Sequence, residues 1–143
     1  MSIYTLSYTS KNLIEDLTAD SLSSVASILE VARSRNAVYG ITGALMFNEG
    51  RFTQILEGSE VAVSKIFKKI KNDVRHSEVS VIATQTNQNR RFESWAMAYV
   101  GKTEPARRYY RSIVGSPEFG WKRVNNDKLC KLLLELVELD ALG

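Results

Sequence analysis

A glutamine in the middle of an apolar strand pattern is the residue that most directly suggests chemistry. From Arg51 to Glu57 the sequence alternates, so Phe52, Gln54 and Leu56 fall on one strand face. Two large apolar neighbours indicate a core face, so we expect the Gln54 amide to be buried. A buried amide without hydrogen-bond partners costs about 1–3 kcal/mol. We therefore expect polar partners beside Gln54, unless the strand lies at a sheet edge and leaves the amide in water.

Four other residues carry side chains that could have a chemical role. Tyr8 shares a strand face with apolar neighbours, where it is either a half-buried core aromatic or a functional phenol. Asn36 stands at the expected end of a helix, where an amide is often only a C-terminal cap. Trp95 and Met97 share a face of a later strand, and sulfur–aromatic packing alone explains such a pair. Taken singly, each has a purely structural interpretation.

Several kinds of site are excluded by residues that the chain lacks. One histidine and one cysteine, His76 and Cys130, are too few for a structural zinc site or an internal disulfide. The eight glycines form neither a dinucleotide-binding fingerprint nor a P-loop. A catalytic triad has only His76 to use, and we expect that residue in a polar turn. We therefore predict no metal site and no hydrolytic chemistry.

Composition predicts one globular domain with an appendage. Of the 143 residues, 44% are hydrophobic and 24% are charged. The net charge of +3 is too small for a dedicated nucleic-acid binder. No apolar run approaches the roughly 20 residues that span a bilayer, and the first residues do not resemble a signal peptide. We expect a cytoplasmic protein, with no membrane and no nucleic-acid partner.

The elements that position these residues follow from hydrophobic periodicity. We predict strands at residues 3–8, 39–47, 51–57, 79–86 and 94–100. A first helix is predicted from residues 20–21 to 35–36, and a second begins at residues 58–59. The order β-α-β-β-α-β-β predicts an α+β, ferredoxin-like sandwich, with a five-stranded mixed sheet and two helices on one face. The inner stripe of the second helix comprises Val63, Ile66, Phe67 and Ile70, and its outer lysines are expected to be solvated.

A C-terminal helical extension is predicted beyond this core. We divide the chain into a core domain, residues 1–101, and an extension, residues 102–143. Residues 104–114 are expected to be helical, and a last amphipathic helix runs from Asn126 or Asp127. Its apolar face is expected to cover the second side of the sheet more readily than to mediate assembly. That face comprises Leu129, Leu132, Leu133, Leu136, Val137 and Leu139.

Together, the polar positions resemble those of one family. Tyr8 lies in Leu-Ser-Tyr-Thr-Ser, Asn36 precedes Gly-Ile-Thr-Gly, and Gln54 lies in Phe-Thr-Gln-Ile-Leu-Glu-Gly. Ser-Trp-x-Met, with Trp95 and Met97, follows in the same order. These motifs resemble the BLUF family, whose members are blue-light sensors that hold a flavin. The short chain with two C-terminal helices is most similar to the stand-alone PixD-type members.

The resemblance implies a flavin, as FAD, FMN or riboflavin, whose ring inserts between the first two helices. It implies apolar walls from Ile28 on the first helix and from Ile66 and Ile70 on the second. Lys69 and Arg75 are implied near the C2 carbonyl or the phosphate side of the flavin. A solvated basic face explains Lys69 equally well.

The polar contacts of the ring are also implied by the resemblance. Asn36 is implied to bind the C4 carbonyl and N3, and Gln54 to reach N5 and O4. Tyr8 is implied to hydrogen-bond Gln54, and Arg35 to lie near the edge of the ring. Excited flavin is a strong oxidant, so Tyr8 would supply an electron and then its proton. Gln54 would be the relay, because an amide both donates and accepts.

The implied output is a change of hydrogen bonds rather than turnover. After the reaction the Gln54 amide has rotated or tautomerised, which would shift the absorption to the red. Trp95 and Met97 would pass the change to the sheet and to the residues after Gly101. PixD-type relatives imply a homo-oligomer, of ring type, and a response-regulator-like protein partner. The run Arg107–Arg111 is a candidate part of such an interface.

Two alternatives remain open at this point. One is a flavin-free ferredoxin-like interaction module in which Gln54 and Asn36 satisfy each other. The other is a small flavin redox enzyme, although the chain shows neither a substrate acid/base pair nor a nicotinamide fingerprint. We expect a sensor that is not an enzyme.

Overall fold

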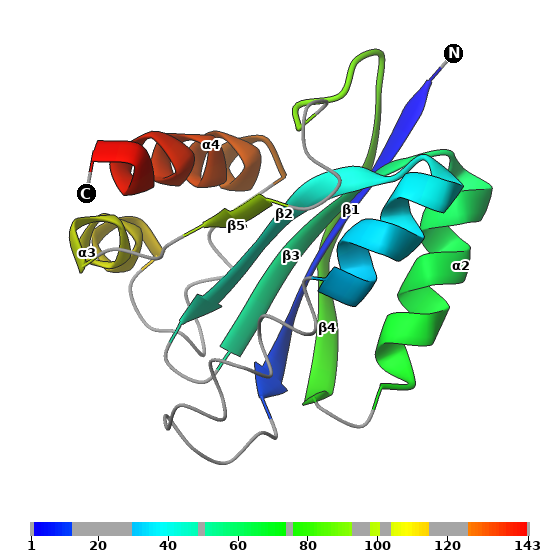
Figure 1. Ribbon diagram of the computed structural model, residues 1–143, viewed down its shortest axis with the longest axis horizontal. Coiled ribbons are helices and arrows are strands. Elements are labelled where there is room, and N and C mark those ends of the chain that lie inside the picture. The colour runs from blue at the N-terminus through cyan, green and yellow to red at the C-terminus, as the bar shows by residue number, and fades with distance from the viewer. Residues whose placement is uncertain are drawn as a thin grey trace.

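The computed structural model describes residues 2–12, 30–48, 51–73, 76–92, 98–100, 104–114 and 126–142. The strands are β1 (Ile3–Asn12), β2 (Thr42–Asn48), β3 (Arg51–Gly58), β4 (His76–Asn87) and β5 (Ala98–Val100). The helices are α2 (Glu60–Lys71), α3 (Glu104–Val114) and α4 (Asn126–Leu142), and residues 30–39 form a helical segment before β2. The sheet order is β4-β1-β3-β2-β5 (Figure 1).

Four strands form the antiparallel body of the sheet. β1 pairs with both β3 and β4, and β2 pairs with β3, all in antiparallel direction. β5 joins the outer side of β2 in parallel direction. The predicted α+β class and helical C-terminal region are confirmed, whereas the division into two domains stays a prediction.

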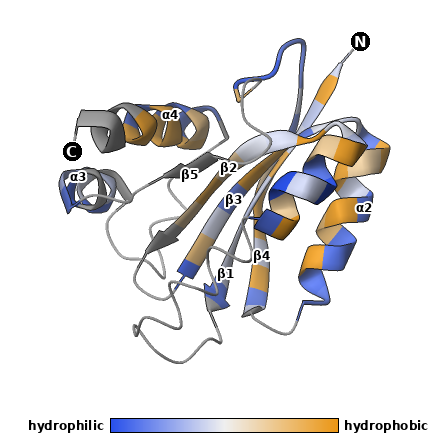
Figure 2. Ribbon diagram, viewed as in Figure 1, coloured by the Kyte–Doolittle hydropathy of each residue, from blue (hydrophilic) through white to orange (hydrophobic). Residues whose placement is uncertain are grey.

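The sheet separates two hydrophobic layers (Figure 1). The helical segment 30–39 and α2 lie on one side, and α3 and α4 lie on the other. The first core packs β1, β3 and α2 together, and its buried residues are Leu6, Tyr8, Ile41, Leu45, Phe52, Leu56, Val63, Ile66 and Ile70. The second packs the opposite sheet face against the C-terminal helices, with Ala44, Met46, Ile55, Phe92, Tyr110, Leu129, Cys130, Leu132, Leu133 and Leu136. The prediction that α4 covers the second side of the sheet is confirmed, and α4 shows mixed hydropathy around its axis (Figure 2).

The first helix ends later than predicted. Asn36 was expected at its end, but helical residues continue to Tyr39, and Gly40 then adopts a φ of +66°. The N–H of Ile41 donates to the carbonyl oxygen of Asn36 at 2.8 Å, which is the hydrogen bond of a Schellman motif. The interpretation of Asn36 as a C-terminal cap is therefore wrong. For the same reason β2 begins at Thr42 rather than at residue 39.

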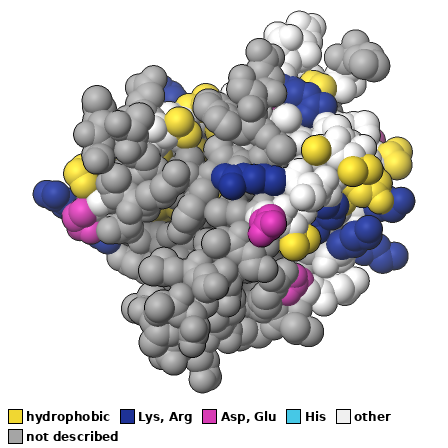
Figure 3. Space-filling view, in the orientation of Figure 1, with side chains coloured by type: hydrophobic (Ala, Val, Ile, Leu, Met, Phe, Trp, Pro, Cys, Tyr) yellow, Lys and Arg dark blue, Asp and Glu magenta, His cyan; other side chains and the backbone are white. Residues whose placement is uncertain are grey.

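The second helix follows the predicted pattern closely. Ser59 is its N-cap, because its hydroxyl accepts the N–H of Ala62 at 3.1 Å. Val63, Ile66 and Ile70 are buried, as the stripe predicts. The exposed side of α2 is rich in lysine, and Lys and Arg side chains gather where α2 lies (Figure 3).

β4 is longer than predicted at both ends. It starts at His76, which pairs with Asn12, so the prediction of a polar turn there is wrong. Strand β1 also extends to Asn12 rather than ending at Tyr8. β1 and β4 are both long because they pair with each other from Ile3↔Asn87 to Asn12↔His76, so each supplies hydrogen-bond partners for the extra residues of the other.

The two tyrosines of the run Arg107–Arg111 make contacts inside the fold. Tyr110 is buried in the second core, and the Tyr109 hydroxyl donates to the Glu135 carboxylate of α4. These two side chains therefore join α3 to α4, and an interface role of the run stays a prediction. Among the residues that the structure describes, none of the helices combines the length and hydropathy of a membrane span.

Candidate functional site

Tyr8 and Gln54 meet inside the molecule. They are direct neighbours across the β1–β3 pairing, and their side chains are only 3% and 4% exposed. The Tyr8 hydroxyl donates a hydrogen bond to Oε1 of Gln54. β3 lies between β1 and β2, so Gln54 is on a central strand and the edge-strand alternative is wrong. The predicted burial of Gln54, with a polar partner, is confirmed.

Burial keeps the Tyr8 phenol protonated. Removal from water raises the pKa of the Tyr8 hydroxyl above its ordinary value of 10.0. The nearby charge of Arg35 lowers this pKa and that of Asp73 raises it, and both effects are smaller than that of burial. Tyr8 therefore enters any reaction as a neutral phenol whose proton points at Gln54. Asp73, just beyond α2, was not anticipated from the sequence.

The surroundings of this hydrogen bond are apolar. The ring of Phe67 on α2 lies 5.4 Å from that of Tyr8, centroid to centroid, at an angle of 46°. Ile66 and Ile70 belong to the same buried cluster as Tyr8. The phenol and the amide are both buried away from water, so their mutual hydrogen bond is stronger than it would be in water.

A bulge in the sheet lies beside Tyr8. The β1–β4 register pairs Ser7 with Ala83 but Tyr8 with Val81, so Ile82 is an extra residue on β4. A bulge bends the strand and changes the aim of nearby side chains, and such irregularities are common next to functional sites. The sequence gives no visible signal for it.

Asn36 is the second buried amide on this side of the sheet. It is fully buried within the helical segment 30–39, one residue after Arg35, which is close enough to Tyr8 to act on its pKa. Lys69 is exposed, and its ammonium lies 5.6 Å from the centre of the Tyr39 ring. A flavin contact of Lys69 stays a prediction. The other predicted site residues lie outside the described residues: Ile28, Arg75, Trp95 and Met97.

The donor set suits a flavin ring. Two buried amides and a phenol beside an apolar cluster offer both donors and acceptors, as a planar heterocycle with alternating polar edges requires. With Oε1 of Gln54 accepting from Tyr8, the NH₂ group of that amide is directed away from the phenol. Within the described part of the chain, no three His, Cys, Asp or Glu side chains gather as metal ligands do.

Comparison with known proteins gives consistent results. The structure is similar to the photo-activated state of BlsA, with a TM-score of 0.77 and 28% identity, over 95% of this chain and 94% of that one. It is also similar to the dark state of BlrB, a BLUF protein, with a TM-score of 0.73 and 25% identity, over 94% and 96% of the two chains.

One curated relative is a photoactivated adenylate cyclase subunit beta of Euglena gracilis. It is 35% identical over 74 residues, which are 51% of this chain and 9% of that protein. This chain thus spans less than a tenth of that relative. Residues 3–98 match the family model described as sensors of blue-light using FAD. Because this match covers most of the chain and includes the Tyr8–Gln54 pair, the chain belongs to the BLUF family of flavin-binding blue-light sensors.

Proposed function

We propose that blue light is sensed through proton transfer and rearrangement at the Tyr8–Gln54 pair. The observation that carries this proposal is the buried hydrogen bond from the Tyr8 hydroxyl to Gln54 Oε1. When bound, a flavin supplies absorption of blue light and a strong oxidant. The chain must then supply an electron, a proton and a group that records the event.

Tyr8 is the donor in this proposal. A phenol that loses an electron to the oxidant becomes a strong acid, and a cation there is unfavourable because Tyr8 is buried away from water. Its proton therefore leaves along the existing hydrogen bond to Gln54 Oε1. Gln54 can accept at this oxygen and release a proton from its nitrogen, which is why an amide can act as the relay.

Gln54 also records the reaction. When the proton and electron have returned, its amide presents a different group to its neighbours, by rotation or by tautomerisation. The proposed consequence is a red-shifted state with no lasting covalent change. We place the flavin between the first helix and α2, held by Asn36 and Gln54, with Ile66 and Ile70 as apolar wall. Their burial on one side of the sheet supports this placement.

The proposed output is a protein–protein interaction and not catalysis. The match to the Euglena cyclase subunit lies within a small part of that protein, whereas the matches to BlsA and BlrB extend over nearly the whole of both chains. We propose a homo-oligomer and a response-regulator-like partner as the receivers of the signal, in the cytoplasm. A ferredoxin-like interaction module without flavin and a flavin redox enzyme are the competing functions.

Absorption spectra before and after blue illumination test the proposal. The FAD-loaded protein should show a reversible red shift, and Tyr8→Phe should bind flavin without a lasting shift. Tyr4→Phe is the matched control, because it removes a hydroxyl from the same strand face and should leave the shift intact. A preparation that never binds flavin would favour the interaction module, and steady oxidation of a nicotinamide donor would favour the enzyme.

A further inference from the structure

Glu57, at the far end of β3, is a buried carboxylate on the strand face opposite Gln54. It is 0% exposed, and its two oxygens accept main-chain N–H groups of consecutive residues. Arg91 N–H donates to Oε2 and Phe92 N–H to Oε1, both at 2.8 Å. The Thr42 hydroxyl lies 3.4 Å from Oε1. Hydrogen bonds to a buried charge are strong, so Glu57 fixes the main chain of residues 91–92 to β3.

Arg90, which precedes these two residues, connects the same segment to the end of the helical segment 30–39. Arg90 Nη2 donates to the carbonyl oxygen of Gly40 at 2.7 Å, where the first helix ends. Its Nη1 donates to the Thr42 hydroxyl at 2.9 Å and to the carbonyl oxygen of Glu57 at 3.1 Å. One guanidinium therefore binds the end of the first helix, the start of β2 and the end of β3.

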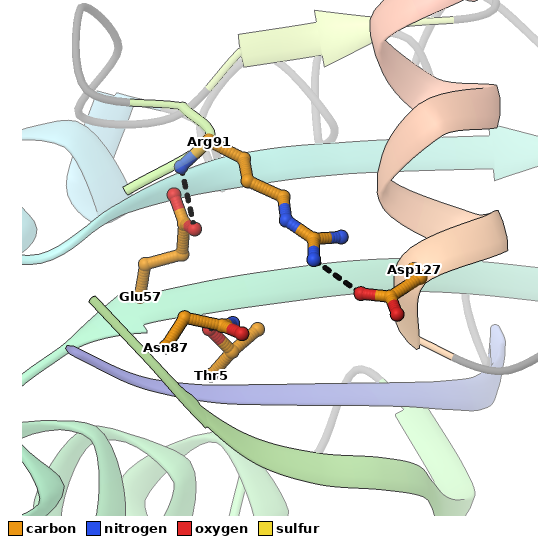
Figure 4. A network of polar contacts seen from close by, with 5 residues as sticks. All are labelled: Thr5, Glu57, Asn87, Arg91 and Asp127. Carbon is orange, nitrogen blue, oxygen red and sulfur yellow. Dashed lines mark hydrogen bonds and ion pairs between the residues drawn. The ribbon is translucent and has the colours of Figure 1, made fainter. Parts of the chain in front are cut away.

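The segment then reaches the C-terminal helix in two ways. The Arg91 guanidinium pairs with the carboxylate of Asp127 in the first turn of α4 (Figure 4). This pairing raises the pKa of Arg91 and lowers the pKa of Asp127, and the hydrogen bond between them is the largest cause of both shifts. The Phe92 ring is fully buried in the core that α4 forms with the sheet. Residues 90–92 thus contact both β3 and α4.

We propose that residues 90–92 carry the light response from β3 to the first turn of α4, with Glu57 as the positioning residue and the Arg91–Asp127 pair as the contact that responds. This inference rests on the proposed function, because it requires a change at Gln54. Gln54 and Glu57 are three residues apart on one central strand, so a shift of β3 moves the carboxylate that holds the segment. An exposed ion pair contributes little to stability. It can therefore be broken and remade without unfolding α4.

Hydrogen exchange of the FAD-loaded full chain, in the dark and under blue light, tests the route. We expect the wild type to show the red shift together with a light-dependent change in exchange at the first turns of α4. Arg91→Gln should keep the red shift and lose the change at α4, because its main-chain bond to Glu57 survives but the ion pair does not. Arg91→Lys, which restores a cation, should regain the response. Arg108→Gln, which removes an exposed ion pair with Glu104 on α3, is the matched control and should keep both signals.

Glu57→Gln tests the positioning role separately. It replaces one acceptor oxygen by a donor, so one main-chain N–H loses its partner. We expect roughly tenfold faster exchange at residues 91–92 in the dark, and loss of the light response at α4 with the red shift retained. If this variant does not fold, Arg91→Gln and Arg91→Lys decide the matter alone.

The outcomes separate the two proposals. A red shift in the wild type with no change at α4, or an undiminished change at α4 in Arg91→Gln, overturns the route and leaves the proposed function standing. A wild type that binds FAD but shows no red shift refutes the proposed function, and the route with it.

Discussion

The hydrogen bond between Tyr8 and Gln54 can be measured by a double-mutant cycle. Tyr8→Phe deletes only the hydroxyl and leaves Oε1 of Gln54 buried without its phenol donor. Gln54→Leu removes this acceptor and leaves the buried Tyr8 hydroxyl without the Gln54 oxygen. Leaving one buried partner unsatisfied costs about 1–3 kcal/mol. We therefore expect each single substitution to lower the free energy of unfolding by an amount in this range.

The double substitution should be far less harmful than the sum of the two. Replacing both partners of a buried hydrogen bond by apolar groups of similar shape is nearly neutral. The site favours this result, because Leu6, Phe52 and Leu56 belong to the same buried cluster and Phe67 packs on the Tyr8 ring. We expect the coupling energy of the cycle to lie at about 1–3 kcal/mol.

Urea unfolding in the dark, at one saturating FAD concentration, gives these energies. The FAD concentration must be fixed, because a bound ligand adds stability by mass action. A control cycle with Tyr4→Phe and Gln54→Leu should show no coupling. Additive effects in the Tyr8–Gln54 cycle would show that the two side chains do not depend on each other. A normal lasting red shift in Gln54→Leu would refute the relay.

Three further predictions concern pH, flavin binding and backbone packing. Folded Tyr8 has a raised pKa and unfolded Tyr8 the ordinary value of 10.0, so its stabilising effect is complete below pH 10 and is lost as the pH rises beyond it. Urea midpoints between pH 8 and about 11 should show this loss in the wild type and less of it in Tyr8→Phe. Asn36→Ala should weaken FAD binding roughly tenfold in a fluorescence titration, because a buried amide partner is removed. Gly43→Ala should destabilise the fold by about 3 kcal/mol or more, since its Cβ would lie 1.8 Å from the carbonyl oxygen of Ile55. Gly58→Ala, with 3.3 Å to the nearest backbone atom, is its milder control in the same urea experiment.

Hydrophobic periodicity predicted the elements well and their ends poorly. The stripe of α2 and the apolar face of α4 were both readable, because each helix buries one face against the sheet. The end of the first helix was missed, because Asn36 is a plausible cap in isolation. The structure ends that helix at Gly40 instead, through a main-chain bond from Ile41. The length of β4 was missed because it depends on pairing with β1, which no local pattern contains.

The site was predictable where two independent signals agreed. For Gln54, strand alternation indicated burial and the family motif indicated a partner, and the structure brings Tyr8 to it. The bulge beside Tyr8 and the charge of Asp73 depend on tertiary structure, and no local sequence pattern indicates them. The burial of Glu57 is also indicated by the sequence pattern. The same alternation that buries Gln54 places Glu57 on the opposite face with Ile55, where a carboxylate must find strong donors.

In the proposed function, that alternation lets one short strand serve both sensing and response. Gln54 and Leu56 face the helical segment and α2, whereas Ile55 and Glu57 face the layer of α4. Because the side chains of a strand share one backbone, a displacement that accommodates a rearranged Gln54 must also act on the opposite face. Ile55 packs there in the α4 core and Glu57 holds residues 91–92, so the proposed route predicts that both respond to the same movement of β3. A substitution on the α4 face can therefore alter the light response while the absorption change at Gln54 stays intact.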